Sequence, residues 1–261
     1  MLRNLVLLVF SAILVACAEV KEVTADQLVE RDGITYEKLS SEPFTGRVTG
    51  DLKTGSYNNG LKSGLWEIYF ETGQLKARRK YLDGKRTGLW EEYLPNGQLF
   101  SRFIYLNGEL NGSEYYYENG QLREGGEFVD GDYNGVWERY YEDGQLSERG
   151  EYDDGELNGI LEKYYENGQL RWRWEFVAGE LNGLFESYYE DGQLEVRGEF
   201  IDGEYNGVWN YFHENGHLWQ FEDWAEGKKN GIWEIYSADG VLELREVWKD
   251  GELVSSTDQD D

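Results

Sequence analysis

Residues 135–155 read GVWERYYEDGQLSERGEYDDG, and this stretch decides the fold. Asp143-Gly144 separates two runs that are rich in aromatic and β-branched residues. A type I′ turn needs positive φ at both central residues, and Asp followed by Gly supplies it. The stretch therefore predicts a β-hairpin with a two-residue turn at Asp143-Gly144.

The rest of the chain repeats this hairpin. The turn glycine recurs every 24 residues, with one step of 23, at Gly73, Gly97, Gly120, Gly144, Gly168, Gly192, Gly216 and Gly240. The glycine that opens each unit keeps the same step, at Gly64, Gly88, Gly112, Gly135, Gly159, Gly183, Gly207 and Gly231. A fixed period in this range indicates stacked units that need their neighbours to bury a face. We expect an all-β fold, an elongated repeat array of antiparallel β-hairpins in a twisted single-layer sheet. About eight 24-residue units follow a truncated first one, and about 16 strands at ~4.8 Å would span roughly 75 Å.

Composition supports a folded array. The 261 residues carry a net charge of −27, which alone would suggest disorder. However, 16% of the residues are aromatic and they recur periodically, unlike the aromatic-poor chains that cannot collapse. The single cysteine excludes a disulfide framework.

The N-terminus resembles a lipoprotein signal. Residues 1–16 hold Arg3 and an apolar run from Leu5 to Val15, which is short for a membrane span. Leu14-Val15-Ala16-Cys17 resembles the bacterial lipobox, in which the cysteine is acylated after cleavage. This predicts a protein that is lipid-anchored at Cys17 in the bacterial cell envelope, at the outer membrane if there is one. A cytosolic protein with an apolar start and an uncleaved anchor are the alternatives.

The remaining boundaries follow from composition and spacing. Residues 17–42 are predicted to be a polar spacer and N-terminal cap, with a small hairpin at Asp32-Gly33. Residues 43–251 form the repeat array, and residues 252–261 are predicted to be an acidic tail.

A two-residue turn predicts the register. We count offsets from the opening glycine of each unit, so that Gly135 is zero; paired offsets then sum to 17. Offset 3, mostly Glu, faces offset 14, mostly Arg, which predicts a Glu–Arg ladder on one face. Tyr at offset 5 shares that face. The candidate partner-binding residues are therefore Tyr69, Tyr93, Tyr140, Tyr164, Tyr188, Glu138, Glu162, Glu186, Arg149, Arg173 and Arg197.

The opposite face is predicted to hold the apolar offsets 2, 6, 11 and 17, for example Trp137, Tyr141, Leu146 and Tyr152. Large residues oppose small ones in this register, since Trp137 faces Gly150. A single layer cannot bury both faces, so this face must either curl into a filled groove or be covered by a partner.

The recurring motif Asn-Gly-x-x-x-Gly-x-Trp-x-x-Tyr-Tyr-x-Asn-Gly-Gln-Leu is nearly complete at Asn206–Leu218 and Asn158–Leu170. It resembles the variant bacterial MORN repeat, which occurs in proteins labelled YwqK-type antitoxins. The resemblance covers about residues 43–251. It implies the fold but no catalytic residues, and the third unit departs from it at Ser113-Glu114, where one residue and the tryptophan are missing.

Other motifs do not predict an enzyme. His213-Glu-Asn-Gly-His217 has the spacing of a zincin motif, which works on a helix, whereas here it spans a hairpin turn. The Asp-Gly turns match no EF-hand, and repeated Glu pairs do not form a unique acid–base dyad. We expect no catalytic residues, no metal site and no cofactor.

Charge is distributed unevenly along the chain. Residues 47–102 hold ten Lys/Arg against six Asp/Glu, whereas residues 103–261 hold 11 against 39, a net charge of −28. This surface would repel nucleic acid and anionic lipid, so membrane contact is expected through the lipid anchor only.

Two functions remain open. One is an anchored scaffold for a protein or peptide partner, which the charge predicts to be basic, and the other is an antitoxin or immunity protein against a basic toxin.

Overall fold

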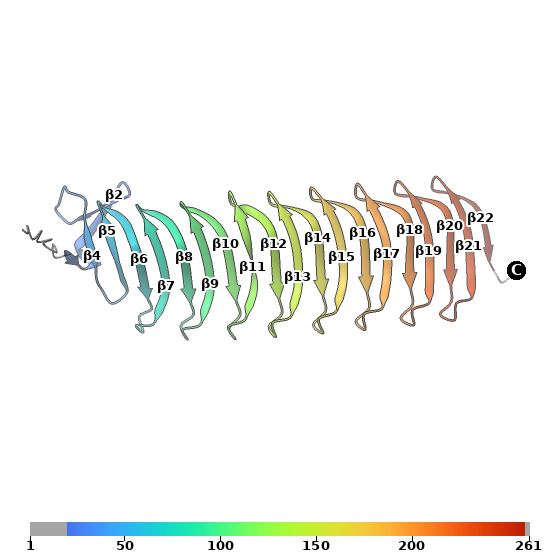
Figure 1. Ribbon diagram of the computed structural model, residues 1–261, viewed down its shortest axis with the longest axis horizontal. Coiled ribbons are helices and arrows are strands. Elements are labelled where there is room, and N and C mark those ends of the chain that lie inside the picture. Colours follow the sequence, from blue (N-terminus) through green and yellow to red (C-terminus); the bar gives the residue numbers. More distant parts are fainter. Residues whose placement is uncertain (1–19, 259–261) are drawn as a thin grey trace, which may run out of the picture.

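The computed structural model describes residues 20–258, which form one open 20-stranded sheet and a separate two-stranded hairpin. From residue 46 to residue 258, each strand pairs antiparallel with the next one along the chain, and the array is long and narrow (Figure 1). The eight full units supply β6–β21, so the predicted all-β array is confirmed. The strands of the first five units are β6 (Leu61–Tyr69), β7 (Leu75–Leu82), β8 (Lys85–Tyr93), β9 (Leu99–Leu106), β10 (Glu109–Tyr116), β11 (Leu122–Val129), β12 (Asp132–Tyr140), β13 (Leu146–Asp153), β14 (Glu156–Tyr164) and β15 (Leu170–Val177). Those of the last three are β16 (Glu180–Tyr188), β17 (Leu194–Ile201), β18 (Glu204–Phe212), β19 (Leu218–Ala225), β20 (Lys228–Tyr236) and β21 (Leu242–Lys249).

The turn inside each unit differs from the predicted type I′ turn. The Gly144 N–H donates to the carbonyl of Tyr141 at 2.9 Å, and the Tyr141 N–H donates to the carbonyl of Gln145 at 2.8 Å. Gly144 has a φ of 88°, whereas Asp143 is not among the residues with positive φ. This is a three-residue loop closed by a left-handed glycine. Asp143 Oδ1 accepts the N–H of Gln145 at 2.9 Å, which explains the preference for Asp or Asn there.

Type I′ geometry occurs instead between the units. Asp154 and Gly155 have φ values of 47° and 82°, and they connect the paired residues Asp153 and Glu156. Both turns carry Asp-Gly, so the dipeptide alone does not distinguish them.

The predicted register holds for most of each hairpin. Trp137 pairs with Gly150 and Glu138 pairs with Arg149. The register shifts near the turn, where Tyr140 pairs with Leu146. Directly opposed residues lie on the same face of a sheet, so Leu146 lies on the face of Tyr140. The prediction that the leucines at offset 11 share a face with the tryptophans is therefore wrong. These leucines lie on the face of the Glu–Arg ladder because of the bulge beside the turn.

The opposite side of the sheet, which we call the Trp face, is filled by the protein's own aromatic rings. Its core is made by the side chains at offsets 2 and 17, and the ring centroids of Trp209 and Phe200 lie 5.0 Å apart. Four of its tryptophans are buried, namely Trp66, Trp90, Trp137 and Trp209. The Trp209 ring lies over Gly198 of the preceding unit, where an added Cβ would come within 2.0 Å of the ring. Of the two alternatives for this face, the groove filled by its own side chains is therefore the one observed.

The N-terminal segment covers the first edge of the array. β1 (Glu22–Val23) pairs parallel with β4 (Gly46–Val48), which pairs with β5 (Lys53–Asn58). A 3₁₀ turn, η1 (Ala25–Gln27), leads into the hairpin of β2 (Leu28–Arg31) and β3 (Ile34–Glu37). Val23, Phe44, Val48 and Trp66 form a buried cluster beneath it. The small hairpin predicted at Asp32-Gly33 is thus observed.

The C-terminal end requires a correction. Residues 252–258, expected to belong to an acidic tail, form β22 (Glu252–Asp258), which pairs with β21. Every residue of β22 is exposed. The array therefore extends seven residues beyond Gly251 in the structure.

The third unit has a shorter bulge than the others. In the fifth unit, Tyr152 pairs with Leu157 and Gly150 with Leu161, so residues 158–160 lie opposite one residue. In the third unit, only Asn111 is inserted between the pairs Leu110–Tyr105 and Gly112–Ile104. The missing residue is thus absorbed at the bulge, and the register on either side of it is kept.

Candidate functional site: the Glu–Arg–Tyr face

The second side of the sheet, the Glu–Arg–Tyr face, carries Glu at offset 3, Tyr at offset 5 and Arg at offset 14. Each Glu divides its two oxygens between neighbours, as Glu138 shows. Its Oε2 accepts the Tyr140 hydroxyl at 2.6 Å, and its Oε1 lies 3.9 Å from Arg149 Nε. Extended strands place residues two apart on the same side, which is why the Glu-x-Tyr spacing brings these groups together.

This arrangement recurs along the array. The Tyr–Glu hydrogen bond is formed by Tyr69, Tyr93, Tyr116, Tyr140, Tyr164, Tyr188 and Tyr236. Arg197 Nε lies 3.7 Å from Glu186 Oε1, as the register predicts. Arg173 is different, because it pairs across the strands with Glu162 but its Nη2 lies 3.8 Å from Glu175 Oε1. The candidate residues therefore lie on one face of the sheet. Arg173 forms an ion pair with Glu175 and not the predicted pair with Glu162.

The environment of the tyrosines keeps them protonated. Partial burial and then the hydrogen bond to Glu138 raise the pKa of Tyr140 to about 12. The same two causes raise the pKa of Tyr164 to about 12, with Glu162 as its acceptor. These phenols are therefore hydrogen-bond donors at neutral pH.

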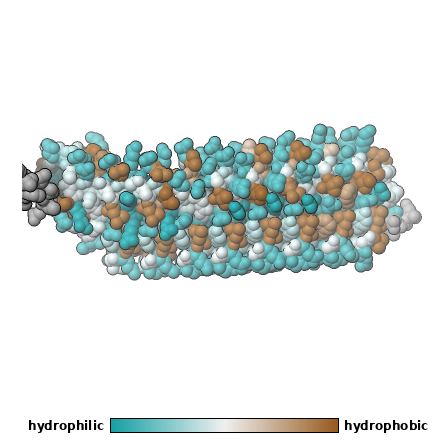
Figure 2. Space-filling view, in the orientation of Figure 1, coloured by the Kyte–Doolittle hydropathy of each residue, from teal (hydrophilic) through white to brown (hydrophobic). Residues whose placement is uncertain are grey.

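Sequence reasoning missed a row of aliphatic side chains on this face. Offset 1 is aliphatic in seven units, at Leu65, Leu89, Val136, Ile160, Leu184, Val208 and Ile232. Four of these, Leu65, Leu89, Val136 and Val208, are exposed. Figure 2 shows hydrophobic side chains in rows along one face of the molecule, among hydrophilic ones. The regular recurrence was visible in the sequence, and alternation from offset 3 places these side chains on the same face.

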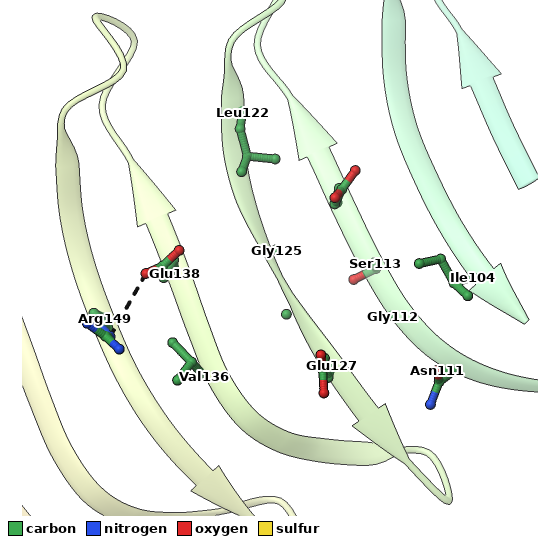
Figure 3. A pocket seen from close by; sticks show the side chains of 12 residues that line it. Ile104, Asn111, Gly112, Ser113, Leu122, Gly125, Glu127, Val136, Glu138 and Arg149 are labelled. Carbon is green, nitrogen blue, oxygen red and sulfur yellow. Dashed lines mark ion pairs between the residues drawn. The ribbon is translucent and has the colours of Figure 1, made fainter. Parts of the chain in front are cut away.

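The ladder is interrupted twice. Gly125 stands at the Arg position of the third unit, and Asn210 and Phe221 replace Glu and Arg in the seventh. A hollow of about 500 Å³ lies at the first interruption. Gly125, Glu138, Val136 and Leu122 line it together with residues of β10 and Ile104 of β9 (Figure 3). A second hollow of about 360 Å³ lies at Asn210 and Arg197.

Six segments of the chain match a family model described as the MORN repeat variant, at residues 62–83, 86–109, 113–130, 133–154, 157–171 and 181–202. The chain contains MORN repeat variants. No curated protein matches it significantly. MORN repeats generally form non-catalytic scaffolds, in keeping with a face built from repeated residues.

The zincin-like motif of the MORN-variant array has a structural role. His213 and His217 flank the turn between β18 and β19. His213 Nε2 lies 3.1 Å from the carbonyl of Tyr236, and His217 Nδ1 lies 2.8 Å from that of Ala238. In other units, a tyrosine hydroxyl makes the same contact as His213, for example Tyr141 with the carbonyl of Tyr164. Within residues 20–258, no group of three or more His, Cys, Asp or Glu is arranged to hold a metal ion.

The membrane-related predictions fall outside the described part of the MORN-variant chain. Cys17 and the segment before it lie outside residues 20–258. Among the described residues, no helix has the length and apolar character to cross a bilayer.

Proposed function

We propose that this MORN-variant array is a non-enzymatic scaffold, lipid-anchored in the bacterial cell envelope, that binds a protein or peptide along its Glu–Arg–Tyr face. The observation that carries the proposal is the contrast between the two faces. The Trp face is filled by its own rings, whereas the opposite face leaves Arg and aliphatic side chains partly exposed along the whole array. Tyrosine and arginine on rigid strands provide contact area at a low cost in ordering.

Charge favours a basic partner. Residues 103–261 carry a net charge of −28, and they include β10 to β22. A uniformly acidic surface speeds the encounter with a positively charged protein and disfavours nucleic acid. Partner binding should therefore weaken as ionic strength rises.

The test is capture of the partner from native envelope extracts. The variant Tyr140→Ser/Tyr164→Ser/Tyr188→Ser removes three rings from the proposed surface, and we expect capture to be lost. Fully exposed Leu39, which lies in the N-terminal segment outside the repeat array, supplies a surface control as Leu39→Ser. Capture that is unchanged in the triple variant, with its melting temperature preserved, would refute the proposed surface.

Anchoring is tested separately. Cys17→Ser should release the protein from membranes and abolish labelling by a palmitate analogue, because the thiol is the only one in the chain. Unchanged partitioning of this variant into membranes would contradict the lipid anchor without bearing on the binding face.

The second candidate function is an antitoxin or immunity lipoprotein that neutralises a basic toxin. The same acidic surface favours it, and the resemblance to YwqK-type proteins suggests it. Co-expression with a secreted toxin encoded beside the gene would decide between the two, since protection of growth is expected only from an immunity protein.

A further inference from the structure

The intact ladder shows how this face holds a guanidinium group. Arg102 lies between two carboxylates, with Nη2 3.8 Å from Glu91 Oε1 and Nη1 3.1 Å from Glu114 Oε2. Its position in the ladder is offset 14, between the Glu of its own unit and the Glu of the next. The planar fork of arginine suits such bridging of two carboxylates.

At Gly125 the same position has no side chain. Gly125 pairs with Glu114 on one neighbouring strand and with Glu138 on the other, so a carboxylate stands on each side of the gap. Glu138 also contacts Arg149, which lines the hollow as well (Figure 3). The ladder position between Glu138 and Glu114 is occupied by Gly125 and not by an arginine. The hollow described above occupies this place.

The chain has no room to fill the gap with a side chain at residue 125. A Cβ there would lie 2.9 Å from the backbone oxygen of Ser113, which is too close without movement of the strand. The missing residue in the third unit shortens the bulge at Asn111, next to this contact. Residue 125 itself therefore cannot supply the missing guanidinium group without a shift of the strand.

We propose that the hollow at Gly125 binds an arginine side chain of the partner, whose guanidinium takes the place of the missing ladder arginine between Glu114 and Glu138. Ile104, Leu122 and Val136 line the same hollow and would contact the methylene groups of that side chain. This inference rests on the proposed binding face and adds the chemistry of one anchoring residue.

The experiment uses N-acetyl-arginine amide as the probe and follows backbone amide shifts by NMR in the whole chain. We expect saturable shifts centred on Gly125, Gly126 and Ser113, with N-acetyl-lysine amide binding more weakly because it lacks the planar fork. Glu138→Gln should weaken the arginine probe about fivefold or more, since it removes one of two charged acceptors. Glu162→Gln is the matched control, because Glu162 makes the same contact with a tyrosine but stands beside Arg149 and Arg173.

A gain-of-function variant separates this site from general attraction to an acidic protein. Arg173→Gly opens an equivalent gap between Glu162 and Glu186, so we expect a second set of saturable shifts there. Shifts spread evenly over the acidic units, or equal weakening by Glu138→Gln and Glu162→Gln, would overturn the proposed site. The probe assay needs no natural partner, so failure of this site and failure of the proposed binding face give separate results.

Discussion

Trp209 and Tyr140 are both aromatic side chains on central strands, yet they lie on faces with opposite properties. Trp209 is 1% exposed, and its ring packs against Tyr205 and Phe200. Tyr140 is half-buried and is held by a single hydrogen bond to Glu138. On the Trp face, neighbouring units are joined by direct ring contacts. On the Glu–Arg–Tyr face, most ion pairs, such as Arg149–Glu138, connect the two strands of one unit and stay near water, and Arg102–Glu114 connects two units.

In this single-layer sheet, the fully buried side chains of the central units are therefore concentrated on the Trp face. Buried rings gain from leaving water, whereas exposed ion pairs contribute little because solvent screens them. Substitutions on the Trp face should therefore cost far more stability than substitutions on the other face.

Trp209→Ala should give the largest loss. It removes a buried ring and the hydrogen bond from Trp209 Nε1 to the carbonyl of Glu199. We expect a decrease of about 3–5 kcal/mol in the free energy of unfolding, measured by chemical denaturation. Trp219→Ala is the matched control, because Trp219 is 44% exposed and should cost much less. Similar losses in both variants would show that the Trp face is not the core.

Gly198→Ala tests the same packing from beneath the ring. The added methyl group would lie within 2.0 Å of Trp209, so the ring must move out of its groove. We expect a loss of about 1–3 kcal/mol by chemical denaturation, as in other overpacked cores. Gly73→Asn is the control, since the space around Gly73 is open and Asn tolerates its left-handed backbone. A neutral Gly198→Ala would mean that the ring packs more loosely than the structure shows.

Alkaline pH should weaken the Glu–Arg–Tyr face. The pKa of Tyr140 and of Tyr164 is raised to about 12 in the folded state, above the value of about 10 in an unfolded chain. A raised pKa means that this stabilisation is complete below pH 10 and is lost as the pH rises toward about 12. We expect the melting temperature, followed by circular dichroism, to fall over that range. Tyr140→Phe/Tyr164→Phe should flatten the decline, and an equally steep decline in this variant would contradict the assignment.

Arg149→Gln should have the smallest effect on stability. The Arg149 side chain is 45% exposed, and its Nε lies 3.9 Å from Glu138 Oε1. Such a pair contributes roughly 0–1 kcal/mol, and salt should reduce the difference further. Chemical denaturation at low and high ionic strength measures it. A loss comparable to that of Trp209→Ala would show that the ladder, rather than the rings, holds the units together.

The sequence was sufficient for the array and for most of its register. The glycine step predicted the hairpins, and the opposition of Trp137 to Gly150 supported the register that the structure shows. Three features were not predictable by the same reasoning. Asp-Gly suits both turn types, so the turn inside the unit was assigned wrongly. That turn produces a bulge, which places Leu146 on the Glu–Arg–Tyr face. The strand β22 was not predicted because no glycine of the repeat pattern follows it.

The candidate site was predicted in part. The Glu-x-Tyr spacing and the opposed Arg placed the ladder residues on one face, because strand alternation needs no knowledge of the bulges. The aliphatic row at offset 1 lies two residues before the Glu at offset 3, so the same alternation places it on this face, although the sequence reasoning did not consider it. The departure at Ser113-Glu114 was also visible in the sequence. The hollow at Gly125 could not be predicted from this departure, because it depends on how closely β10 approaches β11.

The bulge at the opening glycine also bears on how such a chain can change in length. In an ordinary strand, losing one residue exchanges the two faces for every residue that follows. In the fifth unit, the bulge places three residues opposite one residue of the neighbouring strand. In the third unit, it places two residues opposite one, and Glu114 still pairs with Arg102. A single-codon deletion is thus confined to a local change in the surface. The bulges are therefore the places where individual repeats can diverge while the rest of the array keeps its alternation of core and surface.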